Sequence, residues 1–396
     1  MDFIKERVQV LAVLFLTLPW LTSLVLKIHY DPLVQTFLSG LAVVSASFLI
    51  SWSAETAEMD VPRSLSLAVV ALLAVLPEYA VDGYFAWKAG SVGGSYVHYT
   101  TANMTGANRL LIGIGWTLVA FVAFTTAKKG EVKLDDGIRL ENFFLFVSTL
   151  YAFTLPLKGS ITPADSAVFI SIYLLYIFLA TRAEREEVEV AGVPAYLCSM
   201  KKKVRRGVVI SLFLFAGAVI LMSVEAFSEG LIASAKIAGV DEFLAVQWIA
   251  PLASEAPELI VAIYFVRRLR ATAAMNTLIS SKVNQWTLLI GTIALIYSVS
   301  AFRLQALPLD ARQSEEVLLT AAQSLFGLAI LIDLRMSWKE AAALFSLFII
   351  QLLLPSVEVR YIISALYIIL ALPILALKRG ELIKSFHTVT NLAKRG

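Results

Sequence analysis

The sequence predicts an all-α, polytopic membrane protein with about eleven to twelve transmembrane helices, arranged as two inverted-topology repeats. Composition is the first observation: 59% of the 396 residues are hydrophobic and 16% are charged, whereas about a quarter of the residues in a soluble domain are charged. The second is a series of apolar stretches, each near the ~20 residues that a helix needs to cross a bilayer. The third is a pair of acidic proline motifs, one in each half of the chain.

The apolar stretches divide evenly between the two halves of the chain. In the first half they lie at roughly 8–26, 34–53, 64–87, 100–126, 140–157 and 164–181. In the second half they lie at roughly 207–232, 243–266, 271–300, 314–333, 340–355 and 359–377. The fourth and the ninth are long, so we expect them to tilt or to continue beyond the bilayer.

Lysine and arginine are distributed unevenly between the predicted loops. With a cytoplasmic N-terminus, 24 of the 33 fall in inner segments and 7 in outer loops, among which Arg360 is counted; Arg109 and Lys282 fall inside spans. Inner loops of membrane proteins carry this excess of basic residues. Residues 2–12 are typical of a start-transfer segment rather than a cleaved signal peptide. We therefore expect a multi-pass protein of the cell membrane with both termini in the cytoplasm.

Motifs of soluble enzymes are missing from the sequence. No nucleotide-binding loop, zinc-ligand spacing or nucleophile arrangement is present, so we expect no enzyme, no resident cofactor and no nucleic-acid partner. Cys198 is the single cysteine, which excludes an intramolecular disulfide. The three histidines are too scattered to form a ligand pattern; they are His29, His98 and His387.

The two halves repeat one another. In spans four and nine an asparagine precedes a basic residue by six positions, Asn103 to Arg109 and Asn276 to Lys282, and a Trp-Thr-Leu follows in both. Matched spans are five apart, an odd number, so corresponding helices must cross the membrane in opposite directions, as in transporters with inverted repeats. The predicted parts are an extra helix at 1–33, a first repeat at 34–182, a cytoplasmic linker at 183–206, a second repeat at 207–355, and a last helix with a cytoplasmic tail at 356–396.

The acidic proline motifs predict a cation path. They read Leu76-Pro77-Glu78 and Glu255-Ala256-Pro257-Glu258, each inside a predicted span. An ionisable residue at that depth is costly and usually lines an ion or substrate path. Proline interrupts the helix and leaves backbone carbonyls that can bind a cation. These features favour a cation transporter.

These motifs resemble the calcium/cation antiporter superfamily, most closely its cation/proton exchanger branch. The superfamily pairs a Thr-Ser-x-Pro-Glu core with a Gly-Asn-x-x-Gly-Ser-Asn-x-x-Asn core in each repeat. Here the second core reads Ala102-Asn103-Met104-Thr105-Gly106-Ala107-Asn108 in the first repeat, and Asn276 to Ser281 with Asn284 in the second. The resemblance implies exchange of Ca²⁺, or a related divalent cation, for H⁺ by alternating access. A Na⁺/Ca²⁺ exchanger of the same fold and a non-transporting membrane scaffold are the alternatives.

Departures from the superfamily cores favour proton coupling. Sodium-coupled members surround the glutamates with neutral oxygens, and the first repeat lacks them at four positions, Ala74, Val75, Ala107 and Leu111. The second repeat keeps Ser254, Ser280 and Asn284. A proton needs only a carboxylate, and apolar surroundings favour its protonated form.

The candidate ion ligands come from both repeats. Calcium binds six to eight oxygens and favours carboxylates. The candidates are Glu78, Glu255, Glu258, Asn103, Asn276, Ser280 and Asp82. Glu78 pairs with Glu258 if the Pro-Glu steps are matched, or with Glu255 if the alignment is shifted.

Other roles for the intramembrane charges stay open at this stage. Arg109 and Lys282 could form salt bridges with the acids, snorkel to the interface, or replace a cation in one state of the cycle. The asparagines could instead hydrogen-bond between helices. Glu225 and Glu229 are a candidate ion or proton entrance.

Overall fold

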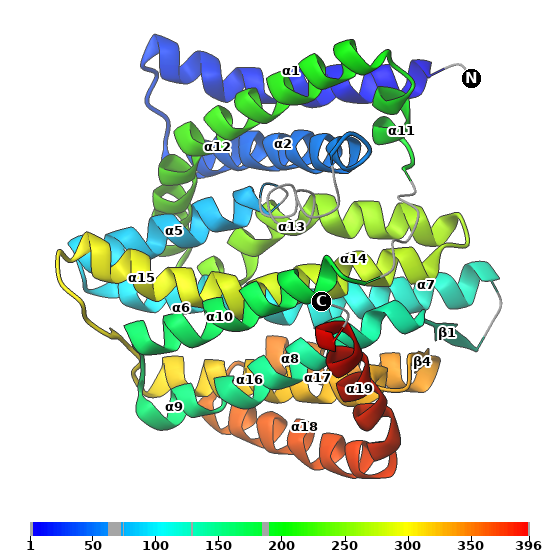
Figure 1. The fold of residues 1–396 in the computed structure, drawn as a ribbon. Coiled ribbons are helices and arrows are strands. Elements are labelled where there is room, and N and C mark those ends of the chain that lie inside the picture. The colour runs from blue at the N-terminus through cyan, green and yellow to red at the C-terminus, as the bar shows by residue number, and fades with distance from the viewer. Residues whose placement is uncertain (1–2, 62–72, 74, 128–129, 184–189, 395–396) are drawn as a thin grey trace. The chain divides into compact units, whose positions relative to one another are not determined.

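The computed structural model (Figure 1) describes the chain except for residues 1–2, 62–72, 74, 128–129, 184–189 and 395–396. Within the described residues, ten helices are long and apolar enough to cross a membrane. They are Ile4–Leu26, Pro32–Glu58, Ser95–Thr126, Asp136–Lys158, Pro163–Ala180, Lys202–Ala238, Glu242–Arg267, Ala271–Ser300, Ala311–Leu331 and Val357–Leu377. The all-α membrane fold is therefore confirmed, and each of the ten coincides with a predicted span.

The other two predicted spans have a different outcome. The third, 64–87, falls partly outside the described residues, and its described part is helix α5 (Leu76–Ser91). The eleventh forms α17 (Trp338–Leu353), which has 16 residues. At 1.5 Å per residue it is about 24 Å long, short of the ~30 Å hydrocarbon core.

The chain divides into two compact units that do not follow its order. Unit 1 comprises Met1–Tyr84 and Glu184–Pro257, and unit 2 comprises Phe85–Ala183 and Glu258–Gly396. Each unit therefore takes helices from both predicted repeats. Residues 184–189 of the predicted linker lie outside the described residues.

Unit 1 contains four whole helices and parts of two others. The whole helices are α1 (Ile4–Leu26), α2 (Pro32–Glu58), α11 (Val193–Cys198) and α12 (Lys202–Ala238). The start of α5 up to Tyr84 and the start of α13 (Glu242–Arg267) up to Pro257 complete it.

Helices α2 and α12 run antiparallel. At one end Thr36 Oγ1 lies 3.0 Å from Ser234 Oγ, and at the other Arg205 binds Asp60 just beyond α2. These helices are the second and seventh predicted spans, five apart. Their opposite directions confirm the inverted topology of the repeats for this pair.

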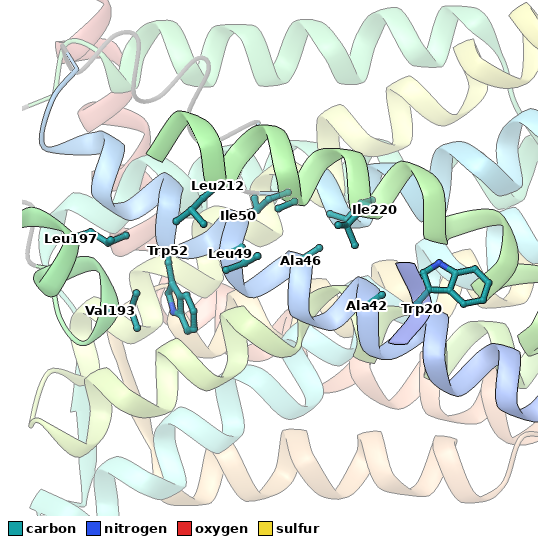
Figure 2. Packing of buried hydrophobic residues seen from close by; sticks show 12 residues of the cluster. Trp20, Ala42, Ala46, Leu49, Ile50, Trp52, Val193, Leu197, Leu212 and Ile220 are labelled. Carbon is teal, nitrogen blue, oxygen red and sulfur yellow. The ribbon is translucent and has the colours of Figure 1, made fainter. Parts of the chain in front are cut away.

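Small residues bring α2 and α12 close together. A Cβ built on Gly40 would lie 2.9 Å from the Phe227 ring, so only glycine fits there without a shift. Close backbone approach through small residues is typical of helix pairs in membranes. Side chains from α1, α11 and α12 complete this core; in Figure 2, Leu212 and Ile220 point from α12 toward α2.

The Asp60–Arg205 ion pair is expected to make stability depend on pH. Arg205 donates to both carboxylate oxygens, at 2.7 and 2.9 Å, and these bonds hold the pKa of Asp60 below its usual range. A lowered pKa stabilises the folded state above the unfolded-state pKa, and this contribution is lost as pH falls through the folded-state pKa. As the pH falls from about 5 to about 3, we expect protonation of Asp60 to destabilise the unaltered protein by on the order of 1 kcal/mol and so to lower its unfolding temperature. Asp60→Asn cannot be protonated there and is expected to lack this loss. Melting curves of both proteins in detergent test this, and equal pH profiles would contradict it.

Unit 2 holds most of the remaining elements. Its helices are α6 (Ser95–Leu110), α7 (Thr117–Ala127), α8 (Arg139–Ala152), α9 (Thr154–Lys158), α10 (Pro163–Ala180), α14 (Ala271–Asn284), α15 (Ile290–Ser300), α16 (Ala311–Leu331), α17, α18 (Val357–Leu377) and α19 (Arg379–Lys394). It also holds two π-helical turns, η2 (Leu111–Trp116) and η4 (Gln285–Leu289), and a 3-10 turn, η3 (Asp136–Ile138). The predicted tail thus contains a helix, α19, whose Glu381 is bound by Arg139 of α8 at 2.9 Å.

Two short sheets in unit 2 reflect the inverted repeat. Strand β1 (Glu131–Lys133) pairs with β4 (Arg335–Ser337), and β2 (Ser160–Ile161) pairs with β3 (Leu307–Pro308), both antiparallel. β1 and β3 follow spans four and nine, and β2 and β4 follow spans five and ten. A shift of five spans therefore converts one sheet into the other.

The repeated Trp-Thr-Leu also has a structural counterpart. Trp116 ends η2 and Trp286 lies in η4, so both long helices widen to a π-helical turn at the matched place. A π-helical turn replaces the regular i to i−4 backbone hydrogen bonds of the α-helix. Backbone carbonyls just before the turn therefore need hydrogen-bond donors from elsewhere. Before η2, Lys282 Nζ and Gln323 Nε2 donate to the carbonyls of Asn108 and Arg109, each at 3.3 Å.

Candidate functional site

Three of the predicted acidic ligands belong to unit 1 and are buried. Glu78 lies in the first turn of α5 and is 3% exposed, and Asp82, one turn later, is 0% exposed. Glu255 lies in α13 and is 2% exposed. Burial of three carboxyl groups in one unit is costly unless they bind cations, protons or other polar groups. Ala74, one of the departures from the superfamily core, lies outside the described residues.

Proline shapes α13 around Glu255. The helix contains Pro251 and Pro257, and Pro257 has no N–H to donate to the carbonyl four residues earlier, at Ala253. The hydroxyl of Ser254 donates to the carbonyl of Pro251 at 3.2 Å. Carboxylate and free carbonyl oxygens are both ligand types that suit a hard cation, and this part of α13 has one of each within three residues.

Glu258, the other acid of the second motif, belongs to unit 2. Ser281 of α14 donates a hydrogen bond to Glu258 Oε2 at 2.6 Å. The two acids of this motif therefore lie on one helix but in different units. The sequence left open whether Glu255 or Glu258 pairs with Glu78. Of the two, Glu255 belongs to the same unit as Glu78.

The predicted polar ligands all lie in unit 2. Asn103 of α6 is fully buried, and neither side-chain amide atom has a hydrogen-bond partner among the described residues. Asn276 Oδ1 of α14 is also buried without such a partner there. Helix–helix hydrogen bonding, the other reading of these asparagines, would occupy these atoms. Ser280 lies one turn after Asn276 on α14 and is partly buried.

Arg109 pairs with an acid that the sequence reading missed. Its Nη2 lies 2.5 Å from Glu316 Oε2, with side-chain exposures of 1% and 0%. Arg360 binds Glu316 at 2.9 Å and Glu315 at 2.6 Å. Arg360, counted with the outer loops, lies in the first turn of α18 and is 3% exposed. In the sequence Arg360 stands at the beginning of an apolar stretch, which predicts a place near the membrane interface. It is buried because α18 packs against α16.

Lys282 has partners of its own in unit 2. Its Nζ lies 2.6 Å from Asn108 Oδ1 and 4.2 Å from the centre of the Trp286 ring. Both intramembrane cations thus have polar partners within unit 2, and these were not the partners considered from the sequence.

Metal-ligating side chains were compared across the described residues for clusters that could hold an ion. In the described parts of the chain, no group of three or more His, Cys, Asp or Glu is placed to hold a metal ion. A transported cation would need neutral oxygens as well as carboxylates, which is the ligand mixture that calcium accepts.

Comparison with known proteins identifies the family. A family model described as sodium/calcium exchanger protein matches residues 32–182 and 208–357, well over half of the chain. The chain belongs to this family. No curated protein matches it.

Solved structures support the same fold. A crystal structure of the H⁺/Ca²⁺ exchanger CAX is 76% identical, covers 100% of both chains and has a TM-score of 0.97. The structure of native YfkE is 17% identical, covers 88% of this chain and 98% of its own, and has a TM-score of 0.61. A structure of the sodium-calcium exchanger NCX_Mj is 16% identical, covers 81% of this chain and 98% of its own, and has a TM-score of 0.54. The last two likenesses establish the family fold alone.

Proposed function

We propose that this protein is a secondary active antiporter that exchanges Ca²⁺, or a related divalent cation, for H⁺ by alternating access. One observation carries the proposal: along its entire length the chain is 76% identical to the H⁺/Ca²⁺ exchanger CAX. The sodium-calcium exchanger NCX_Mj is only 16% identical to this chain, so its likeness does not support sodium coupling here. The protein is a membrane transporter, and its partners are the two exchanged ions and membrane lipid.

Competition at buried carboxyl groups explains how exchange can be coupled. Glu78 and Glu255 are the proposed carboxylates, since both are buried in unit 1. Ionised, they attract a divalent cation; protonated, they lose the charge that holds it. Antiport follows when the ion site switches from one side of the membrane to the other only with a cation or protons bound.

Unit 2 supplies the proposed neutral ligands. Asn103 and Asn276 are proposed amide ligands, supported by buried amide oxygens that lack other partners among the described residues. Asp82, Glu258 and Ser280 are the further candidates. Of these, Glu258 accepts a hydrogen bond from Ser281 within unit 2.

The proposed setting is the cell membrane, with both termini in the cytoplasm. This orientation is supported by the excess of lysine and arginine in alternate loops. No resident cofactor is proposed, because the ions are cargo and exchange needs none.

Calcium uptake into proteoliposomes tests the function. With purified protein, we expect a pH gradient alone to drive uptake of radioactive calcium, because proton binding and calcium binding compete for the same carboxylates. A sodium gradient alone, at equal pH, is expected to drive none above protein-free vesicles. Uptake with the sodium gradient and none with the pH gradient would contradict the proposal.

A further inference from the structure

The helix α19 follows a membrane span almost without a break. Helix α18 ends at Leu377, and α19 begins at Arg379, so Lys378 alone connects them. In Figure 1, α19 (red) turns away from α18 (orange) and runs across it instead of continuing it. Because α18 is long and apolar enough to cross a membrane, the beginning of α19 must lie close to the membrane surface.

Contacts with other helices of unit 2 fix which side of α19 faces the protein. Near the start of α19, Arg139 of α8 binds Glu381 at 2.9 Å. Near its end, the guanidinium group of Arg182, just after α10, donates to the backbone carbonyl of Ala393 at 3.1 Å. Ser385, between these two contacts, is buried. The helix is thus bound to unit 2 at both ends, and its other side is exposed.

The exposed side of α19 carries apolar side chains. Ile383 and Phe386 are three residues apart, so they share one face of the helix, and they are 53% and 52% exposed. On α18, Leu372 and Leu377 are likewise exposed, at 55% and 86%. Exposed apolar side chains on a membrane span face lipid. The apolar surface of α19 therefore comes directly after a lipid-facing surface of the same chain.

Positive charge accompanies these apolar side chains. Residues 378–396 contain five lysines and arginines and one acid, Glu381, which another helix already binds. Arg379, Lys384 and Lys394 are all exposed, and Lys384 also lies 2.7 Å from Glu381. Basic residues beside an exposed apolar helix face are typical of segments that bind the surface of a membrane with anionic lipids.

We propose that the exposed side of α19 is a docking surface for the lipid bilayer. Ile383 and Phe386 insert at the boundary between headgroups and acyl chains. Arg379, Lys384 and Lys394 bind anionic lipid headgroups. Such a helix lies in the plane of the interface, with its apolar face about 5–10 Å below the surface. Lipid fits this surface because it begins at the end of a membrane span and combines apolar with basic side chains. The proposal is independent of which ions the protein exchanges.

Fluorescence quenching by lipids tests the position of α19. Cys198→Ser removes the single cysteine, so Thr390→Cys, on the same face as Ile383 and Phe386, takes one fluorescent label. The full-length protein is placed in vesicles of phosphatidylcholine and phosphatidylglycerol whose acyl chains carry bromine at one of two depths. We expect bromine near the headgroups to quench the label more strongly than bromine near the chain ends, because the helix lies at the interface. No quenching at either depth would overturn the proposal, in favour of a surface that faces water or another protein.

The choice of brominated lipid tests the basic residues. When either phosphatidylglycerol or phosphatidylcholine alone carries bromine, the ratio of the two quenching efficiencies measures the preference of α19 for anionic lipid. We expect a preference for phosphatidylglycerol in the labelled protein and none after the triple change Arg379→Gln, Lys384→Gln and Lys394→Gln. Each charge near the surface changes the binding of anionic lipid on the order of fivefold, and salt should weaken the preference.

Lys339→Gln is the matched control for the triple change. Lys339 is exposed at the start of α17, and its neighbour Glu340 lies 3.7 Å from Lys378, so it removes a charge on the same side of the membrane. It is expected to keep the lipid preference. The triple variant should unfold in detergent at the temperature of the unaltered protein, because its changed side chains are exposed. Equal lipid preference in the triple variant and in Lys339→Gln would overturn the role of the basic residues. Neither measurement involves transport, so failure of the proposed exchange would leave both outcomes unchanged.

Discussion

Glu78→Gln and Glu255→Gln are each expected to abolish cation exchange while leaving the protein folded. Glutamine keeps the size of the side chain but has neither a negative charge for Ca²⁺ nor a proton to exchange. Carboxylate number is the main determinant of calcium affinity, so both proton-driven uptake and calcium self-exchange should fall, on the order of a hundredfold. Uptake of radioactive calcium into proteoliposomes, with equal amounts of folded protein, measures both.

Two further glutamates make this experiment more informative. Glu358, in the first turn of α18, is exposed, so Glu358→Gln is the control and should change neither rate. Glu258→Gln separates the alternatives left by the sequence, because it should lower both rates less than Glu255→Gln if Glu255 is the partner of Glu78. If Glu78→Gln and Glu255→Gln both kept full exchange, the antiporter proposal would be abandoned.

Arg109→Gln is expected to destabilise the protein more than any surface substitution. Arg109 and Glu316 are almost fully buried and 2.5 Å apart. Removing one partner of a buried ion pair leaves an uncompensated charge and costs about 3–5 kcal/mol. Arg360 also binds Glu316 at 2.9 Å, so it compensates part of the charge left on Glu316 and we expect the lower end of that range.

A double-mutant cycle tests whether the pair acts as a unit. Arg109→Gln, Glu316→Gln and the double variant are compared by thermal unfolding in detergent, with exposed Arg379→Gln as the control. We expect the double variant to be more stable than the sum of the single losses predicts, because it buries no unmatched charge. Strictly additive losses would show that the two residues do not stabilise each other.

Patterns of hydrophobicity and charge were sufficient for the fold class. A helix that crosses lipid must satisfy its own backbone and present apolar side chains, so spans appear directly as apolar stretches. The same logic predicted the opposite directions of spans two and seven, which Thr36–Ser234 and Asp60–Arg205 confirm. The repeated Trp-Thr-Leu marked matched positions, although the sequence did not indicate the π-helical turns there.

Partners of buried charges were beyond the sequence. Arg109 was weighed against the glutamates of the acidic proline motifs, but it binds Glu316, more than two hundred positions away. Glu315 and Glu316 appear in the sequence as the polar beginning of an apolar stretch, and Arg360 as the beginning of another. The one general indication in the sequence was that a buried arginine needs an acidic partner, which does not say which acid it is.

By itself, the sequence determined that this is an all-α membrane protein of two inverted repeats, with acidic proline motifs inside its spans, because those properties depend on local hydrophobicity and on repetition along the chain. Tertiary structure alone decided which helices form each compact unit, which acid binds each buried arginine, and that Tyr176 of α10 donates to Glu141 of α8. Such contacts depend on the packing of helices distant in sequence, and helical periodicity gives the face of a residue but not the neighbour it meets.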